Sequence, residues 1–172
     1  MKKRKTLHIV RHAKSNWDYD NISDIDRPLK LKGIKNAYEM ARRIKIRNAL
    51  PELMITSPAN RAIHTAIIFA RVFELPLSKI IIEENLYATE EDSVMDIIKK
   101  TDNSVKSLMI FGHNPELTYF ANIFVKNTID NISTAGIVSL VFDIENWKDI
   151  SKKKLISELF DFPKKDLQVE SL

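Results

Sequence analysis

The sequence predicts an α/β fold, a three-layer sandwich in which a mostly parallel central sheet has helices on both faces and an antiparallel edge strand. Short apolar runs alternate along the chain with segments in which apolar residues recur every three or four positions, as in strands joined by crossover helices. Two strand-like runs near the end lack a helical period between them, which favours an antiparallel pair. No repeat, Ser/Gly linker or low-complexity tract divides the chain, so we expect one domain over residues 1–172.

Six apolar runs are the predicted strands. Each is short and bounded by polar or turn-forming residues. Helical segments separate the first four runs, so we expect these strands to be parallel. A polar connection joins the last two, so we expect them to pair at an edge of the sheet. The runs cover residues 7–10, 53–56, 79–83, 108–111, 137–142 and 155–160.

Helices are predicted between these strands, because apolar residues there fall on one helical face. Ser57-Pro58 and Asn114-Pro115 precede two of them. A Ser or Asn side chain can accept from the free N–H groups of a first turn, and proline has no N–H to leave unpaired there. We therefore expect helices to begin at these two pairs. The four periodic segments cover residues 31–44, 62–73, about 90–100 and 117–124.

The composition excludes several classes of chemistry and partner. The chain has no Cys, which rules out thiolate catalysis and Cys-ligated zinc or iron–sulfur clusters. No apolar stretch approaches the length of a membrane span. The excess of 27 Lys+Arg over 23 Asp+Glu lies largely in two Lys runs without interleaved aromatic residues, which favours solubility over nucleic-acid binding. We expect a cytoplasmic protein with neither membrane nor nucleic acid as a partner.

Cationic residues follow three of the predicted strands. Arg11 and His12 come directly after the first strand, Arg61 follows the second, and His113 follows the fourth. The carboxyl ends of parallel strands meet at one edge of a sheet, so these side chains should converge. Arg27 could add a third guanidinium. Such a cluster, with no acid at the same strand ends, is costly unless an anion neutralises it, and planar bidentate guanidiniums suit phosphate.

An imidazole among arginines should have a pKa below its usual value of roughly 6.5 and so keep one ring nitrogen unprotonated. That nitrogen would be a nucleophile for phosphorus. Phosphoryl transfer requires mainly positioning and charge stabilisation, which N–H donors can supply. The chain has four His and no His-Glu-x-x-His motif or carboxylate cluster of ligand spacing. We therefore expect no metal and no cofactor.

The segment Leu-His-Ile-Val-Arg-His-Ala-Lys-Ser at residues 7–15 resembles the strand-plus-RHG signature of the histidine phosphatase superfamily, also called phosphoglycerate mutase-like. It is most similar to the short SixA-type phosphohistidine phosphatase branch. The resemblance continues in the expected order over most of the chain and implies a single histidine phosphatase domain with the phosphoglycerate mutase-like fold. The further matching segments are residues 26–29, 57–62 with Thr65, 86–88, 112–115 and 133–135.

The resemblance implies a role for each candidate site residue. The four core positions of the superfamily match Arg11, His12, Arg61 and His113. His12 would attack phosphorus and become phosphorylated, the other three would hold the transferred group, and water would then release phosphate. Arg27 matches an additional phosphate-contacting arginine. Ser15 could add a hydroxyl or backbone contact.

Two departures from the superfamily pattern affect the expected chemistry. Ala13 replaces the glycine of the signature, so the loop must accept a Cβ. Longer members place a general acid after the third strand, but none of the nearby glutamates matches that position. An alkoxide leaving group needs such an acid, whereas the imidazole of phosphohistidine leaves more readily. The absence of a matching acid favours a substrate with an N–P bond; the nearby glutamates are Glu83, Glu84, Glu90 and Glu91.

The expected function is hydrolysis of phosphohistidine on a phosphorylated protein, such as a histidine phosphotransfer domain. A chain of this length leaves no room for an inserted lid, and an open site admits a protein surface. One alternative is a phosphomonoesterase that acts on a small phosphorylated metabolite or phosphopeptide, with a glutamate as acid. Another is a module that binds phosphorylated proteins without turnover.

Several residues also have a purely structural interpretation. His8 lies within the first strand and is expected to pack in the sheet, and His64 is expected at the surface of its helix. Arg27 could pair with a neighbouring aspartate instead of phosphate. Trp17 and Tyr19 could form either a rim that meets the partner or ordinary packing. The aspartates beside Arg27 are Asp24 and Asp26.

Overall fold

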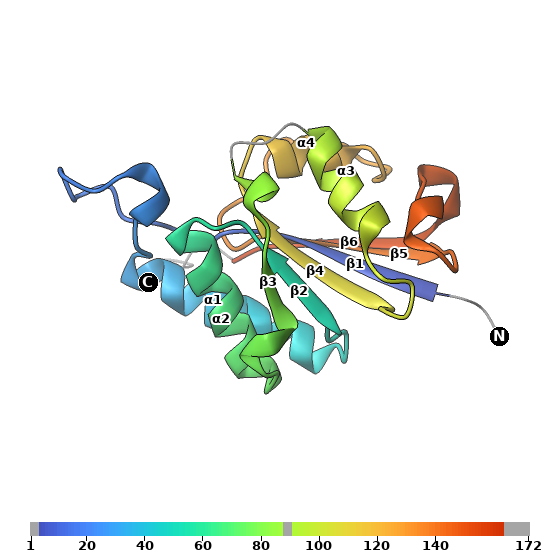
Figure 1. The fold of residues 1–172 in the computed structure, drawn as a ribbon, viewed down its shortest axis with the longest axis horizontal. Helices are drawn as coiled ribbons and strands as arrows, with labels where there is room; N and C mark the ends of the chain where they lie inside the picture. Colours follow the sequence, from blue (N-terminus) through green and yellow to red (C-terminus); the bar gives the residue numbers. More distant parts are fainter. Residues whose placement is uncertain (1–3, 88–90, 164–172) are drawn as a thin grey trace, which may run out of the picture.

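A computed structural model describes residues 4–87 and 91–163, which form one six-stranded sheet in the order β3-β2-β4-β1-β5-β6 (Figure 1). Strands β1 to β4 pair in parallel, and β5 runs antiparallel to both β1 and β6. The predicted fold class, including the antiparallel pair at the edge, is therefore confirmed. The strands are β1 (Arg4–Arg11), β2 (Leu53–Thr56), β3 (Ile80–Ile82), β4 (Ser107–Gly112), β5 (Ile137–Asp143) and β6 (Leu155–Asp161).

Helices cover both faces of the sheet. Figure 1 shows α1 and α2 on one side and α3 and α4 on the other. Helices α1, α2 and α3 each connect two parallel strands, as expected for crossover helices, whereas α4 leads from β4 to the antiparallel strand β5. The helices are α1 (Leu31–Ile46), α2 (Asn60–Phe73), α3 (Glu91–Lys100) and α4 (Glu116–Asn122).

Alternation along the strands produces two separate cores. In β1, Leu7 and Ile9 face the core of α3 and α4, whereas Val10 faces the core of α1 and α2. This is the two-residue period of a sheet buried on both faces. Phe69 and Phe111 pack edge to face in the α1/α2 core, with ring centroids 5.3 Å apart. With all these side chains removed from water, the sheet gives the strand ends a rigid base.

Both predicted helix starts are wrong. Helix α2 begins at Asn60 with Ala59 as its N-cap. Ser57 is still part of the sheet edge, because its N–H donates to the carbonyl of Phe111 at 3.0 Å. A residue held in strand geometry cannot also begin a helix, so the chain needs two more residues to turn. The Ser57 hydroxyl is thereby available to His113.

The second predicted helix start, at Asn114-Pro115, also precedes the observed one. Helix α4 begins at Glu116, with Pro115 as the N-cap. The Asn114 side chain does not cap the helix backbone. It accepts from the Thr118 hydroxyl at 2.9 Å and donates to the Ile132 carbonyl at 2.9 Å. Asn114 therefore joins α4 to the loop before β5.

In the two described ranges, no helix is both long enough and apolar enough to span a membrane.

Candidate active site

The carboxyl ends of β1, β2 and β4 open into a pocket of about 520 Å³. The six residues singled out in the sequence all line this pocket: Arg11, His12, Ser15, Arg27, Arg61 and His113. They meet because three parallel strands place the residues that follow them at one edge of the sheet. The structure adds Lys14, Trp17, Lys30, Asn114, Asn131, Ser133 and Thr134 to the lining.

His12 is buried at the base of this pocket. Its Nδ1 lies 2.7 Å from the carbonyl oxygen of Ala13. A carbonyl oxygen only accepts, so Nδ1 carries the proton and Nε2 carries the lone pair in the neutral ring. Burial and, to a lesser extent, the neighbouring groups His113, Arg61 and Arg11 lower the pKa of His12 to about 3, although the Ala13 hydrogen bond opposes the shift. His12 is therefore neutral at physiological pH.

His113 lies beside His12, with the two ring centroids 5.1 Å apart. Nε2 of His113 is 2.8 Å from the Ser57 hydroxyl, and the ring of Tyr87 packs edge to face against it. Burial and the charge of Arg61 lower the pKa of His113 to about 4. Two neutral imidazoles thus share one pocket, each oriented by a hydrogen bond.

Arg11 and Arg61 are anchored through one part of each guanidinium. Nη1 of Arg11 donates to the Ile132 carbonyl at 2.8 Å, and Nη1 of Arg61 donates to the Asp24 carbonyl at 2.6 Å. Among the described residues, four lining residues retain a buried polar atom without a partner: Arg11 Nε, Arg61 Nε, His113 Nδ1 and Ser133 Oγ. Unsatisfied buried donors are rare in proteins and call for a ligand or water.

Arg27 is held from three sides. Its Nη1 donates to the Ser15 hydroxyl at 2.6 Å and its Nε donates to Asp24 Oδ1 at 3.0 Å. The ring of Trp17 lies over its guanidinium, 3.5 Å from Cζ to the ring centroid. Arg27 therefore does pair with an aspartate, and it also lines the pocket. Ser15 is connected to the pocket through Arg27.

An acid, Asp24, contacts the cationic residues without lining the pocket, which corrects the expectation that the cluster has no acid beside it. Asp24 Oδ2 accepts from Arg61 Nη2 at 3.0 Å and from the Tyr87 hydroxyl at 2.8 Å. Burial alone would raise the pKa of Asp24, but hydrogen bonds from Tyr87, Arg61 and Arg27 lower it to about 2. The sequence placed Asp24 near Arg27 but gave no sign of its contact with Arg61.

The loop after β1 is fixed against the start of α1. The N–H of Lys30 donates to the Lys14 carbonyl at 2.9 Å, and Ser15 forms an isolated antiparallel bridge with Leu29. A Cβ at Gly33 would lie 2.2 Å from that same Lys14 carbonyl oxygen. Only glycine allows α1 to approach the loop this closely.

The replacement of glycine by Ala13 is accommodated without strain. Ala13 is fully buried, and its φ angle is not positive. Its N–H donates to the Thr65 hydroxyl at 3.0 Å, and that hydroxyl donates to the Arg61 carbonyl at 2.6 Å. Ala13 thus connects the His12 loop to the helix that carries Arg61.

Two of the glutamates considered as a general acid, Glu83 and Glu84, have described side chains, and neither lines the pocket. Glu83 accepts from the backbone N–H and the side chain of Asn85, and Glu84 is exposed. Glu90 lies outside the described residues. Glu91 begins α3, and its side chain is not described. Among the described residues, no three His, Asp or Glu side chains are grouped to hold a metal ion.

Three residues considered in the sequence do not line the pocket: His8, His64 and Tyr19. His8 is fully buried in β1, with Nδ1 2.8 Å from the Ser139 hydroxyl, and His64 is half-buried on α2. Trp17 and Tyr19 are 72% and 54% exposed, so the rim interpretation fits both better than interior packing.

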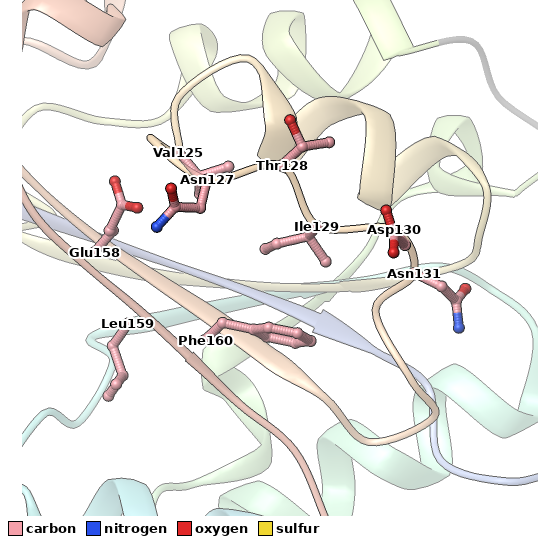
Figure 2. A pocket seen from close by; sticks show the side chains of 9 residues that line it. All are labelled: Val125, Asn127, Thr128, Ile129, Asp130, Asn131, Glu158, Leu159 and Phe160. Atoms are coloured by element: carbon pink, nitrogen blue, oxygen red, sulfur yellow. The ribbon is translucent and has the colours of Figure 1, made fainter.

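A second hollow of about 440 Å³ lies beside the loop between α4 and β5 (Figure 2). Asn131 of this loop lines both hollows. The centre of the second hollow is formed by Ile129 and Phe160, and Glu158 and Asp130 lie at its ends. The described residues that line it include no Arg, Lys or His. It therefore lacks the donors that the first pocket gathers for an anion.

An α/β sheet with arginines and paired imidazoles at its strand ends has the donor chemistry that suits an oxyanion. Comparison with known proteins gives the family: the sequence model of the histidine phosphatase superfamily (branch 1) matches residues 7–105. The chain belongs to this superfamily, and its activity class is that of a phosphatase.

Individual proteins resemble this chain in sequence or in fold. An uncharacterised protein of Mycobacterium tuberculosis is 27% identical over 137 residues, covering 77% of this chain and 80% of the relative. A candidate phosphohistidine phosphatase SixA from Agrobacterium tumefaciens superposes with a TM-score of 0.75 at 23% identity, covering 90% of this chain and 97% of the other. The protein histidine phosphatase SixA complexed with tungstate gives 0.72 at 22%, covering 91% and 94%. At these identities the structural matches show the fold.

Proposed function

We propose that this protein is a phosphohistidine phosphatase that acts on phosphorylated proteins through a covalent intermediate on His12 and needs no metal. The proposal rests on one observation. A neutral, buried His12 lies in the same pocket as buried donors that have no partner among the described residues. The similarity to SixA structures supports the substrate class.

His12 is the proposed nucleophile. The hydrogen bond to the Ala13 carbonyl keeps the proton on Nδ1 and leaves the lone pair on Nε2. Because burial holds the pKa of His12 near 3, the ring is neutral without help from a general base. A neutral imidazole is the reactive form for attack on phosphorus.

The proposed phosphate donors are Arg11, Arg61 and His113. The buried Nε atoms of the two arginines have no partner within residues 4–87 and 91–163, so they can donate to a phosphate. Ser57 Oγ accepts from the N–H of Ala59 at 3.3 Å; if its proton goes to His113 Nε2, the ring proton remains on Nδ1. Such donors stabilise the charge on the equatorial oxygens, about 1.5–3 kcal/mol for each charge-assisted bond. They also repel a metal cation, so the scheme assigns none.

Two displacements then complete the reaction. His12 Nε2 forms a bond to phosphorus while the N–P bond of the substrate breaks, and the bonding electrons stay with the departing imidazole nitrogen, which takes a proton from solvent. Water next forms a bond to phosphorus, the P–Nε2 bond breaks, and its electrons return to Nε2. One water proton goes to solvent as phosphate leaves.

The ionised state of Asp24 favours an N–P substrate over an alkyl ester. Asp24 is ionised at neutral pH because its pKa is about 2, and both its oxygens accept hydrogen bonds. It has no proton to give to an alkoxide. An imidazole leaving group can be protonated before it departs, so it does not need that acid.

The rim of the pocket favours a protein as the substrate. Trp17 borders the pocket, and both Trp17 and Tyr19 are more than half exposed. Exposed aromatic residues beside a site are typical of protein contacts.

Parallel assays on a phosphohistidine protein and on an alkyl phosphate, such as glycerol phosphate, test the proposal. General acids contribute about 10² to 10⁴-fold to rates, so we expect kcat/KM to be at least roughly 100-fold higher for the phosphohistidine protein. p-Nitrophenyl phosphate, whose leaving group needs no acid, checks that the enzyme is active. Preference for the alkyl ester would instead establish a phosphomonoesterase that acts on small molecules or phosphopeptides.

A further inference from the structure

Asp24 joins three side chains that come from separate parts of the chain. Its Oδ1 accepts from Arg27 Nε at 3.0 Å, and its Oδ2 accepts from Arg61 Nη2 at 3.0 Å and from the Tyr87 hydroxyl at 2.8 Å. The Asp24 carbonyl also accepts from Arg61 Nη1. One aspartate thus fixes two guanidiniums of the pocket relative to each other.

Asp24 engages only part of each guanidinium. Arg61 keeps a buried Nε without a partner among the described residues, and Arg27 turns Nη1 to Ser15. Asp24 itself does not line the pocket, and its side chain is 47% exposed. It therefore acts on a bound phosphate through the two arginines.

The Asp24 carboxylate is also an anion, and it already pairs with Arg27 and Arg61, the two arginines whose charge would neutralise a bound phosphate. Hydrogen bonds from Tyr87 and the two arginines keep it ionised. Like charges separated by a few ångströms repel, and this repulsion is only partly screened at a half-buried site. The positive charge that Arg27 and Arg61 offer to phosphate is therefore reduced.

We propose that Asp24 is a positioning residue and the internal counter-ion of the phosphate site. It holds Arg27 and Arg61 in the arrangement that the phosphoryl group meets, and it weakens the hold of the pocket on inorganic phosphate so that the product leaves. This inference rests on the proposed phosphate site and does not depend on which phosphorylated substrate is hydrolysed.

Calorimetric titration of inorganic phosphate into the wild-type protein and Asp24→Asn tests this role. The substitution removes the charge but keeps the shape, and the backbone carbonyl that binds Arg61 remains. We expect phosphate to bind about 3- to 10-fold more tightly to the variant. A purely structural role predicts weaker binding, because the arginines would lose their orientation.

Asp20→Asn is the matched control. Asp20 is on the same loop as Asp24, it is exposed, and it does not line the pocket. We expect this variant to bind phosphate within about two-fold of the wild type, because exposed charges are screened. An equal gain in both variants would mean that general charge, and not the contacts of Asp24, sets the affinity, and would overturn the proposal.

Kinetics on a small phosphoramidate give a second readout. For Asp24→Asn we expect KM to fall, since the phosphate group is held more tightly, and kcat to fall because the arginines are less well fixed. Asp24→Glu restores the charge and should return the phosphate affinity toward that of the wild type. A rise in KM for Asp24→Asn would overturn the proposal.

Folding of each variant is checked by circular dichroism, and Asp24→Ser replaces Asp24→Asn as the neutral variant if the latter is unfolded. Failure of the wild-type protein to bind phosphate would refute the proposed phosphate site itself. Phosphate binding by the wild type, with equal or weaker binding by a folded neutral variant, would refute only the role of Asp24.

Discussion

The hydroxyl of Ser57 lies 2.8 Å from Nε2 of His113. Ser57 follows β2 and His113 follows β4, so the contact joins the carboxyl ends of two neighbouring parallel strands beside the pocket. Because the Ser57 N–H is tied to Phe111 in β4, the hydroxyl has little freedom. Ser57 therefore fixes the orientation of the His113 ring.

Ser57→Ala should lower activity without unfolding the protein. Loss of one hydrogen bond, worth about 0.5–1.5 kcal/mol, corresponds to a decrease in kcat of roughly 2- to 13-fold. Steady-state kinetics on a phosphohistidine protein measure it. Ser78→Ala, at an exposed position of a 3-10 turn, should leave kcat unchanged. Wild-type kcat in Ser57→Ala would show that the hydroxyl has no part in positioning His113.

Gly33→Ala should destabilise the protein, although alanine normally favours a helix over glycine by about 1 kcal/mol. The new Cβ would lie 2.2 Å from the Lys14 carbonyl oxygen, a backbone atom that can move only with the loop that follows His12. We expect a loss of about 1–3 kcal/mol in the free energy of unfolding, measured by urea denaturation, together with reduced activity.

Gly112→Ala provides the comparison, because its Cβ would meet only the side chain of Leu117, at 3.3 Å. The cost there should be smaller than at Gly33. A Gly33→Ala variant as stable as the wild type would contradict the close approach of α1 to the loop.

The strands and their order along the chain were predictable because the apolar pattern of each strand is local. In β1 the alternation of Leu7, His8 and Ile9 follows directly from the two-residue period, and parallel pairing then brings the strand ends together. The site residues at those ends needed only this topology to be placed near each other.

Other features depend on contacts that a local pattern does not carry. The bond from Arg61 to Asp24 crosses 37 residues and depends on the path of the loop before α1. Ser57 has the sequence of a helix cap, but its N–H pairs with β4 and extends the strand. The contact of Asn131 with Asn114 likewise joins two loops. None of these follows from periodicity or capping preference.

Stability should fall as the pH is lowered from 7 toward 4.5. Burial lowers the pKa of His8 to about 4, of His12 to about 3 and of His113 to about 4. The unfolded chain takes up protons near the ordinary value of 6.5, whereas the folded chain does not, so the unfolded state gains stability as pH falls below 6.5. Each histidine contributes about 1.4 kcal/mol per pH unit within that window.

Urea denaturation at pH 7.0, 6.0 and 5.0 measures this effect. Asp24 has a lowered pKa, so its contribution is lost only below its ordinary value of 3.8 and lies outside this range. His8→Gln should reduce the pH dependence, since one of the three groups is removed. Equal stability at pH 7.0 and 5.0 would show that the three rings are not buried in the neutral form.

The most direct test of His12 as the nucleophile is to trap the labelled enzyme. The protein is mixed with a ³²P-phosphohistidine protein, quenched in base and digested, and the labelled peptide is sequenced. We predict a base-stable, acid-labile label on His12 that is absent in His12→Ala and kept in His64→Ala, whose half-buried imidazole does not line the pocket. Label that persists in folded His12→Ala, or that maps to another residue, would contradict this assignment.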